Sequence, residues 1–137
     1  MIDKLEGFLL YNVSDDWAPI GEFDGTVERV APEEYSRTNV LGVIKFLADE
    51  GYILLGAFPG GGRGWEPWDV SSEEAIHRIA HGYDDIPGYL EISDDEIGSS
   101  EVFRAAITDS GRNRLQELGD PYEKYGDPWE DDPYLRS

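Results

Sequence analysis

The stretch VLGVIKFLADEGYILL, residues 40–55, decides the fold because it predicts an amphipathic helix that runs into a buried strand. Its apolar side chains recur at i, i+3, i+4 and i+7, the spacing of one helical face: Val40, Val43, Ile44 and Leu47. Ser36 is placed to cap this helix and Gly51 to end it, so we expect a helix over residues 36–50. The apolar run at 52–58 then predicts a mostly buried strand.

The stretch FRAAITDSGRNRLQEL, residues 103–118, predicts a second strand and a closing helix. From Val102 to Thr108, a set of mixed polar and apolar side chains alternates with a set of wholly apolar ones, as in a half-buried strand. The helix is expected to open near Asp109 and to stop at Gly119, which cannot continue it favourably.

Two further helices are expected before these stretches. Residues 3–12 place their apolar side chains near one face, and a second helical pattern follows Trp17. Between the two strands lies a long insertion, 60–100. Within it we expect a short helix over 72–81 and a short strand over 89–92.

This order of elements resembles the winged helix-turn-helix superfamily, which includes MarR-like and PadR-like transcription regulators. The stretch 40–55 looks like a recognition helix running into the first wing strand. The start of the last helix looks like the usual Thr-x-x-Gly-Arg of that superfamily, here Thr108, Gly111 and Arg112. The resemblance covers about residues 3–59 and 101–118. It implies a divergent, acidic α+β domain with three helices and a two- or three-stranded wing.

The resemblance also implies where DNA would bind. Many relatives place polar and basic side chains of the third helix in the major groove, and basic wing residues on the backbone. The residues of this chain that match are Arg37, Thr38, Asn39 and Lys45, with Arg63 on a phosphate.

The net charge favours a different partner. The formal charge is −19, from 30 Asp and Glu against 11 Lys and Arg. No segment is a basic island, whereas DNA binding draws on clustered Lys and Arg, so a phosphate backbone would be repelled. We therefore expect a basic protein partner, with DNA as the alternative. A surface that mimics DNA, or a compositional habit of the source, also explains the acidity.

Several classes of site are excluded or disfavoured. The chain has no cysteine, which excludes disulfides and thiolate metal sites. Its N-terminal apolar run, 7–13, is too short to cross a membrane, and we expect a cytoplasmic protein without a membrane partner.

His77 and His81 have the spacing of a zinc pair, but Arg78 replaces the zincin glutamate. We expect no metal, no cofactor and no enzymatic activity.

The glycine-rich stretch FPGGGRGWEPWD, residues 58–69, is predicted to form the turn that leaves the first wing strand. It lacks the Gly-Lys-Ser/Thr ending of a phosphate-binding loop, and its tryptophans are expected to pack back on the domain. The alternative is that it contacts a partner, since Arg and Trp are favoured interface anchors. The candidate partner contacts, with one tail residue, are Arg63, Trp65, Trp68 and Trp129.

The chain is thus expected to form one winged-helix-like domain over 1–119, with its insertion at 60–100, and an acidic tail over 120–137. The tail repeats an Asp-Pro-aromatic step three times, from Asp120, Asp127 and Asp132. Because proline restricts each step, we expect an extended, ordered strap lying on the body. The alternative is a linear interaction motif.

For function, the sequence favours a non-catalytic interaction module or adaptor that meets a basic protein through its acidic surface. The alternative is a winged-helix transcriptional regulator that binds DNA as a homodimer. An inhibitor that mimics DNA is the third interpretation.

Overall fold

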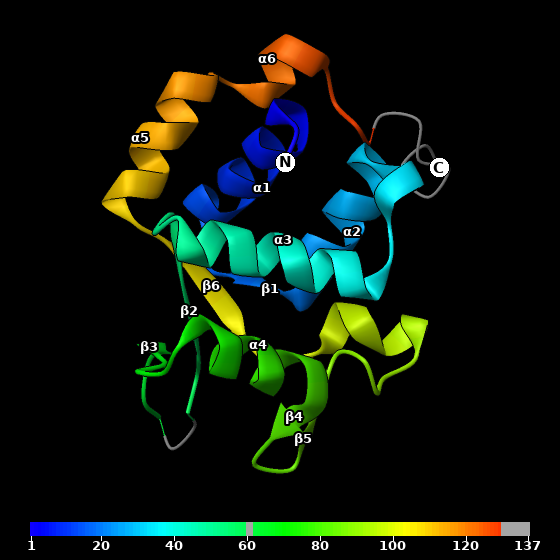
Figure 1. Cartoon of the computed structure of the whole chain (residues 1–137), viewed down its shortest axis with the longest axis vertical. Coiled ribbons are helices and arrows are strands. Elements are labelled where there is room, and N and C mark those ends of the chain that lie inside the picture. The colour runs from blue at the N-terminus through cyan, green and yellow to red at the C-terminus, as the bar shows by residue number, and fades with distance from the viewer. Residues whose placement is uncertain (60–61, 130–137) are drawn as a thin grey trace.

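Six α-helices surround a small antiparallel sheet in the computed structural model, which describes residues 1–59 and 62–129 (Figure 1). The expected α+β class is confirmed. Each predicted helix is present, with these bounds: α1 Asp3–Asp15, α2 Ile20–Val30, α3 Arg37–Asp49, α4 Ser72–His81 and α5 Asp109–Leu118. The sixth, α6, spans Pro121–Tyr125, and a 3-10 turn, η1, spans Pro32–Glu34. No helix within the described ranges is both long and apolar enough to cross a membrane.

The sheet joins segments that are far apart in the sequence. Its strands, in spatial order, are β1 Ala18–Pro19, β6 Arg104–Ile107, β2 Ile53–Ala57 and β3 Glu66–Pro67. All neighbours are antiparallel, and Leu55 lies opposite Ala105 in the central pair. The two strands expected from the sequence are therefore β2 and β6, and they pair directly.

The insertion packs into the same core as the rest of the chain. It holds α4, the two-stranded hairpin of β4 Gly82–Tyr83 and β5 Ile86–Pro87, and the 3-10 helix η2 Asp94–Ser99. Ile79 and Tyr89 are fully buried and belong to one apolar cluster with side chains of α1, α2 and α3. The insertion is thus part of the body, and it covers one side of α3 (Figure 1).

The strand expected over 89–92 is wrong. The backbone N–H groups of Tyr89 and Leu90 donate to the carbonyl oxygens of Ile79 and Ala80, at 2.8 and 3.0 Å. These acceptors lie in the last turns of α4, where carbonyls lack helical donors. The segment therefore turns under the helix end, and no strand within the described residues pairs with it.

The extended strap expected for the tail is wrong over 121–125, where the chain forms α6. The Asp120 carboxylate accepts a hydrogen bond from Tyr122 N at 2.8 Å, and proline suits the first helical turn. The Asp127 carboxylate accepts from Trp129 N in the same way, at 2.9 Å. The third step, 132–134, lies outside the described residues.

Both described steps aim a ring at the helical body. The Tyr122 ring lies edge-on to Phe8, with centroids 5.1 Å apart, and close to Tyr11. The Trp129 ring lies over α2, with its centroid 5.4 Å from the Arg29 guanidinium. Aromatic contacts therefore hold the described part of the tail against α1 and α2.

Gly56 should not tolerate a side chain without a backbone shift, because the paired backbone of β3 occupies the space that a Cβ would take. A Cβ at this position would lie 2.2 Å from the carbonyl oxygen of Glu66. Gly56→Ala is expected to lower the free energy of unfolding by about 1–3 kcal/mol, since the backbone must shift. Urea denaturation measures the change. Gly98→Ala is the control, because a Cβ there meets open space, and an equal loss in both variants would contradict the prediction.

Candidate functional site

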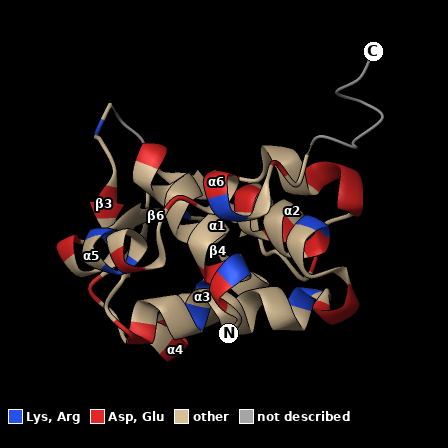
Figure 2. Cartoon of the chain, turned by 90° about the horizontal axis from the view of Figure 1, so that it is seen from above, with Lys and Arg blue, Asp and Glu red and all other residues tan. Residues whose placement is uncertain are grey.

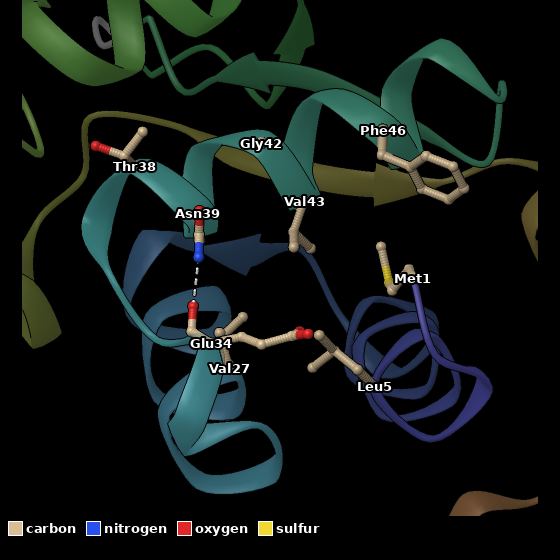
Figure 3. Close-up of a pocket in the computed structure, with 9 residues that line it drawn as sticks. All are labelled: Met1, Leu5, Val27, Glu34, Thr38, Asn39, Gly42, Val43 and Phe46. Atoms are coloured by element: carbon tan, nitrogen blue, oxygen red, sulfur yellow. Dashed lines mark hydrogen bonds between the residues drawn. The ribbon is translucent and has the colours of Figure 1, made fainter.

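A groove of about 480 Å³ runs along the outer face of α3, between α1 and α2 (Figure 3). Its walls are largely apolar and come from three helices and the chain start: Met1, Leu5, Val27, Val43 and Phe46. The remaining lining residues are Glu34, Thr38, Asn39 and Gly42. The volume falls within the range of about 300–1,000 Å³ that ligand sites in proteins commonly have.

The groove exists because α3 has two different faces. One face carries the fully buried side chains that periodicity predicted, including Val40 and Ile44. The outer face carries Phe46, which stays 37% exposed although it is a large apolar residue. Its neighbour Val43 is half-buried. Apolar surface thus continues around α3 from the core into the groove.

Glu34 supplies the only charged side chain among the nine lining residues. Its carbonyl oxygen accepts a hydrogen bond from Asn39 Nδ2 at 2.6 Å, which ties η1 to the first turn of α3. Its side chain extends along the groove toward Leu5 (Figure 3). No Lys or Arg within 1–59 and 62–129 pairs with its carboxylate.

Gly42 keeps the middle of the groove open. It lies inside α3, is exposed, and a Cβ built there would meet nothing within 4 Å. Glycine at an interior helix position costs about 0.5–1 kcal/mol relative to alanine. Because packing does not require glycine here, its presence points to the open surface itself.

Arg37 lies away from the groove and holds the insertion to α3. Its guanidinium donates to the carbonyl oxygens of Tyr89 and Ile92, both at 2.6 Å, and to the Asp94 carboxylate at 2.7 Å. It also lies over the Tyr89 ring, 5.3 Å from the centroid. Arg37, the first residue expected to contact DNA, therefore makes its hydrogen bonds within the chain itself.

Behind Arg37 lies a buried carboxylate, Asp24, which is 7% exposed. One of its oxygens accepts hydrogen bonds from the hydroxyl groups of Tyr35 and Tyr89, at 2.7 and 2.5 Å. Burial, followed by the bond to Asp24, raises the pKa of both phenols well above the usual value. The phenols therefore remain donors, and the network joins α2, the start of α3 and the insertion.

The other cations expected at a DNA interface are also engaged with carboxylates. Lys45 Nζ lies 2.7 Å from an Asp49 oxygen, one turn along α3, and Arg63 pairs with Glu66. Thr38 and Asn39 do line the groove. Figure 2 shows Lys and Arg scattered among Asp and Glu around the described part of the fold. The five residues therefore do not form one basic face.

The tryptophans of the insertion pack against the domain, as the sequence predicted. Trp65 Nε1 donates to the Arg104 carbonyl at 3.0 Å, and its ring stacks with Trp17, with centroids 6.3 Å apart. Trp68 lies edge-on to Tyr83, at 5.2 Å, and beneath the Arg78 guanidinium. Trp129 lies on α2, so the candidate partner contacts are dispersed over three separate places.

His77 and His81 are both exposed on α4, with ring centroids 4.8 Å apart. Within the part of the chain that the structure describes, no group of three potential metal ligands comes together. The pair is therefore two neighbouring surface side chains there.

Sequence reasoning missed the apolar groove. The groove brings α3 together with Leu5 and Val27, and no local sequence pattern links these segments. The available signal was Gly42 next to apolar side chains on a face that a fully solvated helix would make polar.

Comparison of the chain with protein families, with curated proteins and with solved structures found no match.

The Asp24 network predicts a loss of stability in alkali. Tyrosine ionises near pH 10 in the unfolded chain, whereas Tyr35 and Tyr89 hold their protons to higher pH in the fold. Their contribution is complete below pH 10 and is lost as pH rises toward the folded values. The free energy of unfolding, from urea denaturation at increasing pH, should therefore decline above about pH 10.

Tyr89→Phe should flatten this decline and also lower stability at neutral pH by about 1–3 kcal/mol, because it removes a donor from a buried carboxylate. Tyr125→Phe, which changes an exposed side chain, is the control. An unchanged alkaline slope in Tyr89→Phe would show that the network is not responsible.

Proposed function

We propose that this chain is a non-catalytic, winged-helix-like interaction module that binds a basic protein through the α3 groove and the acidic surface around it. The winged-helix assignment is supported by the order of α1, α2 and α3 before two paired strands and a closing helix. A cytoplasmic location is part of the same proposal.

The observation that carries this proposal is the character of the outer face of α3. Winged-helix proteins that bind DNA need polar and basic side chains on this helix. Here Arg37 and Lys45 are engaged with acceptors of the chain, and the outer face is an open apolar groove with one carboxylate. Apolar surface flanked by acidic side chains suits a protein segment better than a phosphate backbone.

Cross-linking from the groove tests this function. A photoreactive amino acid at Thr38, which is exposed and lines the groove, should capture a basic protein in cells that express the chain. The same group at Gln116, exposed on α5, is the matched control. The capture should disappear when Phe46→Ala removes part of the apolar wall. Equal capture from both positions, or capture that survives Phe46→Ala, would contradict a groove-directed partner.

DNA binding is the second candidate, favoured by the same order of elements. Its test is the fluorescence anisotropy of a labelled mixed-sequence duplex titrated with the protein at low and moderate salt. We expect no binding at low salt, where repulsion from the −19 charge is least screened. Binding that weakens with salt and is lost in Lys45→Ala would instead establish the DNA-binding regulator.

A further inference from the structure

We propose that the α3 groove binds a basic amphipathic helix, whose apolar face covers Val43 and Phe46 and whose lysine or arginine reaches Glu34. This inference rests on the proposed function and specifies the shape and charge of the partner segment. Three independent observations lead to it: the placement of one carboxylate, the helical walls and the open glycine.

The charge inside the groove selects a basic side chain. Glu34 is the one charged lining side chain and has no cationic partner in the described residues. Its neighbours along the groove, Leu5 and Val27, are apolar and buried. A lysine or arginine side chain complements this site, because its aliphatic stem covers apolar atoms while its charged head binds the carboxylate.

The two basic side chains of α3 do not occupy this site. Arg37 is directed to the insertion, and Lys45 pairs with Asp49 one turn along α3. Both basic side chains of α3 are thus paired with acceptors of the chain, and neither lines the groove. A basic segment can approach the groove without meeting either of them at its surface.

The walls of the groove favour a helix over an extended peptide. An extended peptide leaves its backbone N–H and C=O groups unpaired unless a sheet edge completes them. The groove is lined by residues of α1, α2, η1 and α3, and by no residue of a β-strand. A helix satisfies its own backbone and offers apolar anchors at i, i+3, i+4 and i+7.

Gly42 allows the two helices to approach closely. A Cβ at this position meets open space, so no side chain of the chain itself takes up the space that glycine leaves. The surface of α3 is therefore lowest in the middle of the groove, between Val43 and Thr38. A larger side chain at Gly42 should hold the partner helix away.

The probe is a designed helical peptide of about 18 residues, long enough to hold a helix in water. It carries leucines at i, i+3, i+4 and i+7 and lysines at the positions that flank this apolar stripe, from which they can reach Glu34. A twin peptide carries glutamates in place of the lysines. Binding to the full chain is measured by calorimetry and by amide chemical shifts. We expect the lysine peptide to bind and to change the amide chemical shifts of α3. We expect the glutamate twin not to bind.

Paired variants locate the interaction. Glu34→Gln should weaken binding of the lysine peptide by about fivefold, the effect of one partly exposed ion pair. Glu33→Gln removes the same charge from a neighbouring residue outside the groove and should leave affinity within about twofold. Gly42→Leu should abolish binding by filling the groove, whereas Gln116→Leu on α5 should have no effect.

Each contrary result overturns the inference. Equal effects of Glu34→Gln and Glu33→Gln would mean that general acidity attracts the peptide. Equal binding of both peptides would show that binding does not depend on the peptide's charge. Chemical-shift changes outside α3 would show that the peptide does not bind in the groove. A lysine peptide that does not bind would exclude the basic helix. Whether the groove serves any protein is decided separately by the Thr38 cross-link, which uses no designed peptide.

Discussion

The arrangement of this molecule depends on a carboxylate that has been placed in the core. Asp24 on α2 would be costly to bury alone, and two tyrosine hydroxyl groups offset that cost by donating to it. One donor, Tyr35, comes from the segment before α3, and the other, Tyr89, comes from the insertion. The three segments must therefore assemble together, because each leaves the others with an unsatisfied polar group.

The Asp24 network also explains why the two sides of α3 differ, one covered by the insertion and the other open. Tyr89, once fixed by Asp24, presents its carbonyl and its ring to Arg37, and the insertion then covers the charged side of the helix. The opposite side receives no covering element from within the described chain and becomes the groove. The insertion therefore decides which residues of α3 are available to a partner, although it supplies no residue to the groove lining.

The sequence was informative where local chemistry determines structure. Ser36 accepts a hydrogen bond from Asn39 N at the start of α3, as the sequence predicted. Ser71 accepts one from Glu74 N at the start of α4 in the same way. The strands β2 and β6 were expected from their apolar patterns, and residues 72–81 form the expected helix. These features depend on spacings of a few residues, which a single sequence displays directly.

The misses share a physical cause, which is contact between segments distant in sequence. Residues 89–92 resemble a strand in composition, yet their amides bond to the end of α4. Arg37 resembles a solvent-facing helix residue, yet acceptors more than fifty positions away hold it. The tail was read as extended because of its prolines, although Pro121 follows an aspartate cap and begins a helix. The groove forms only where three helices from different parts of the sequence meet, so no single stretch of sequence predicts it.

One aromatic contact gives this fold an internal optical signal. Trp17 lies just ahead of β1 and Trp65 just ahead of β3, and these are the two outer strands of the sheet. Their indole planes are nearly parallel, with an interplanar angle of 25°. Two such chromophores couple their transitions only while they remain neighbours. The circular dichroism of this pair therefore reports whether the edges of the sheet are held together, without any added label.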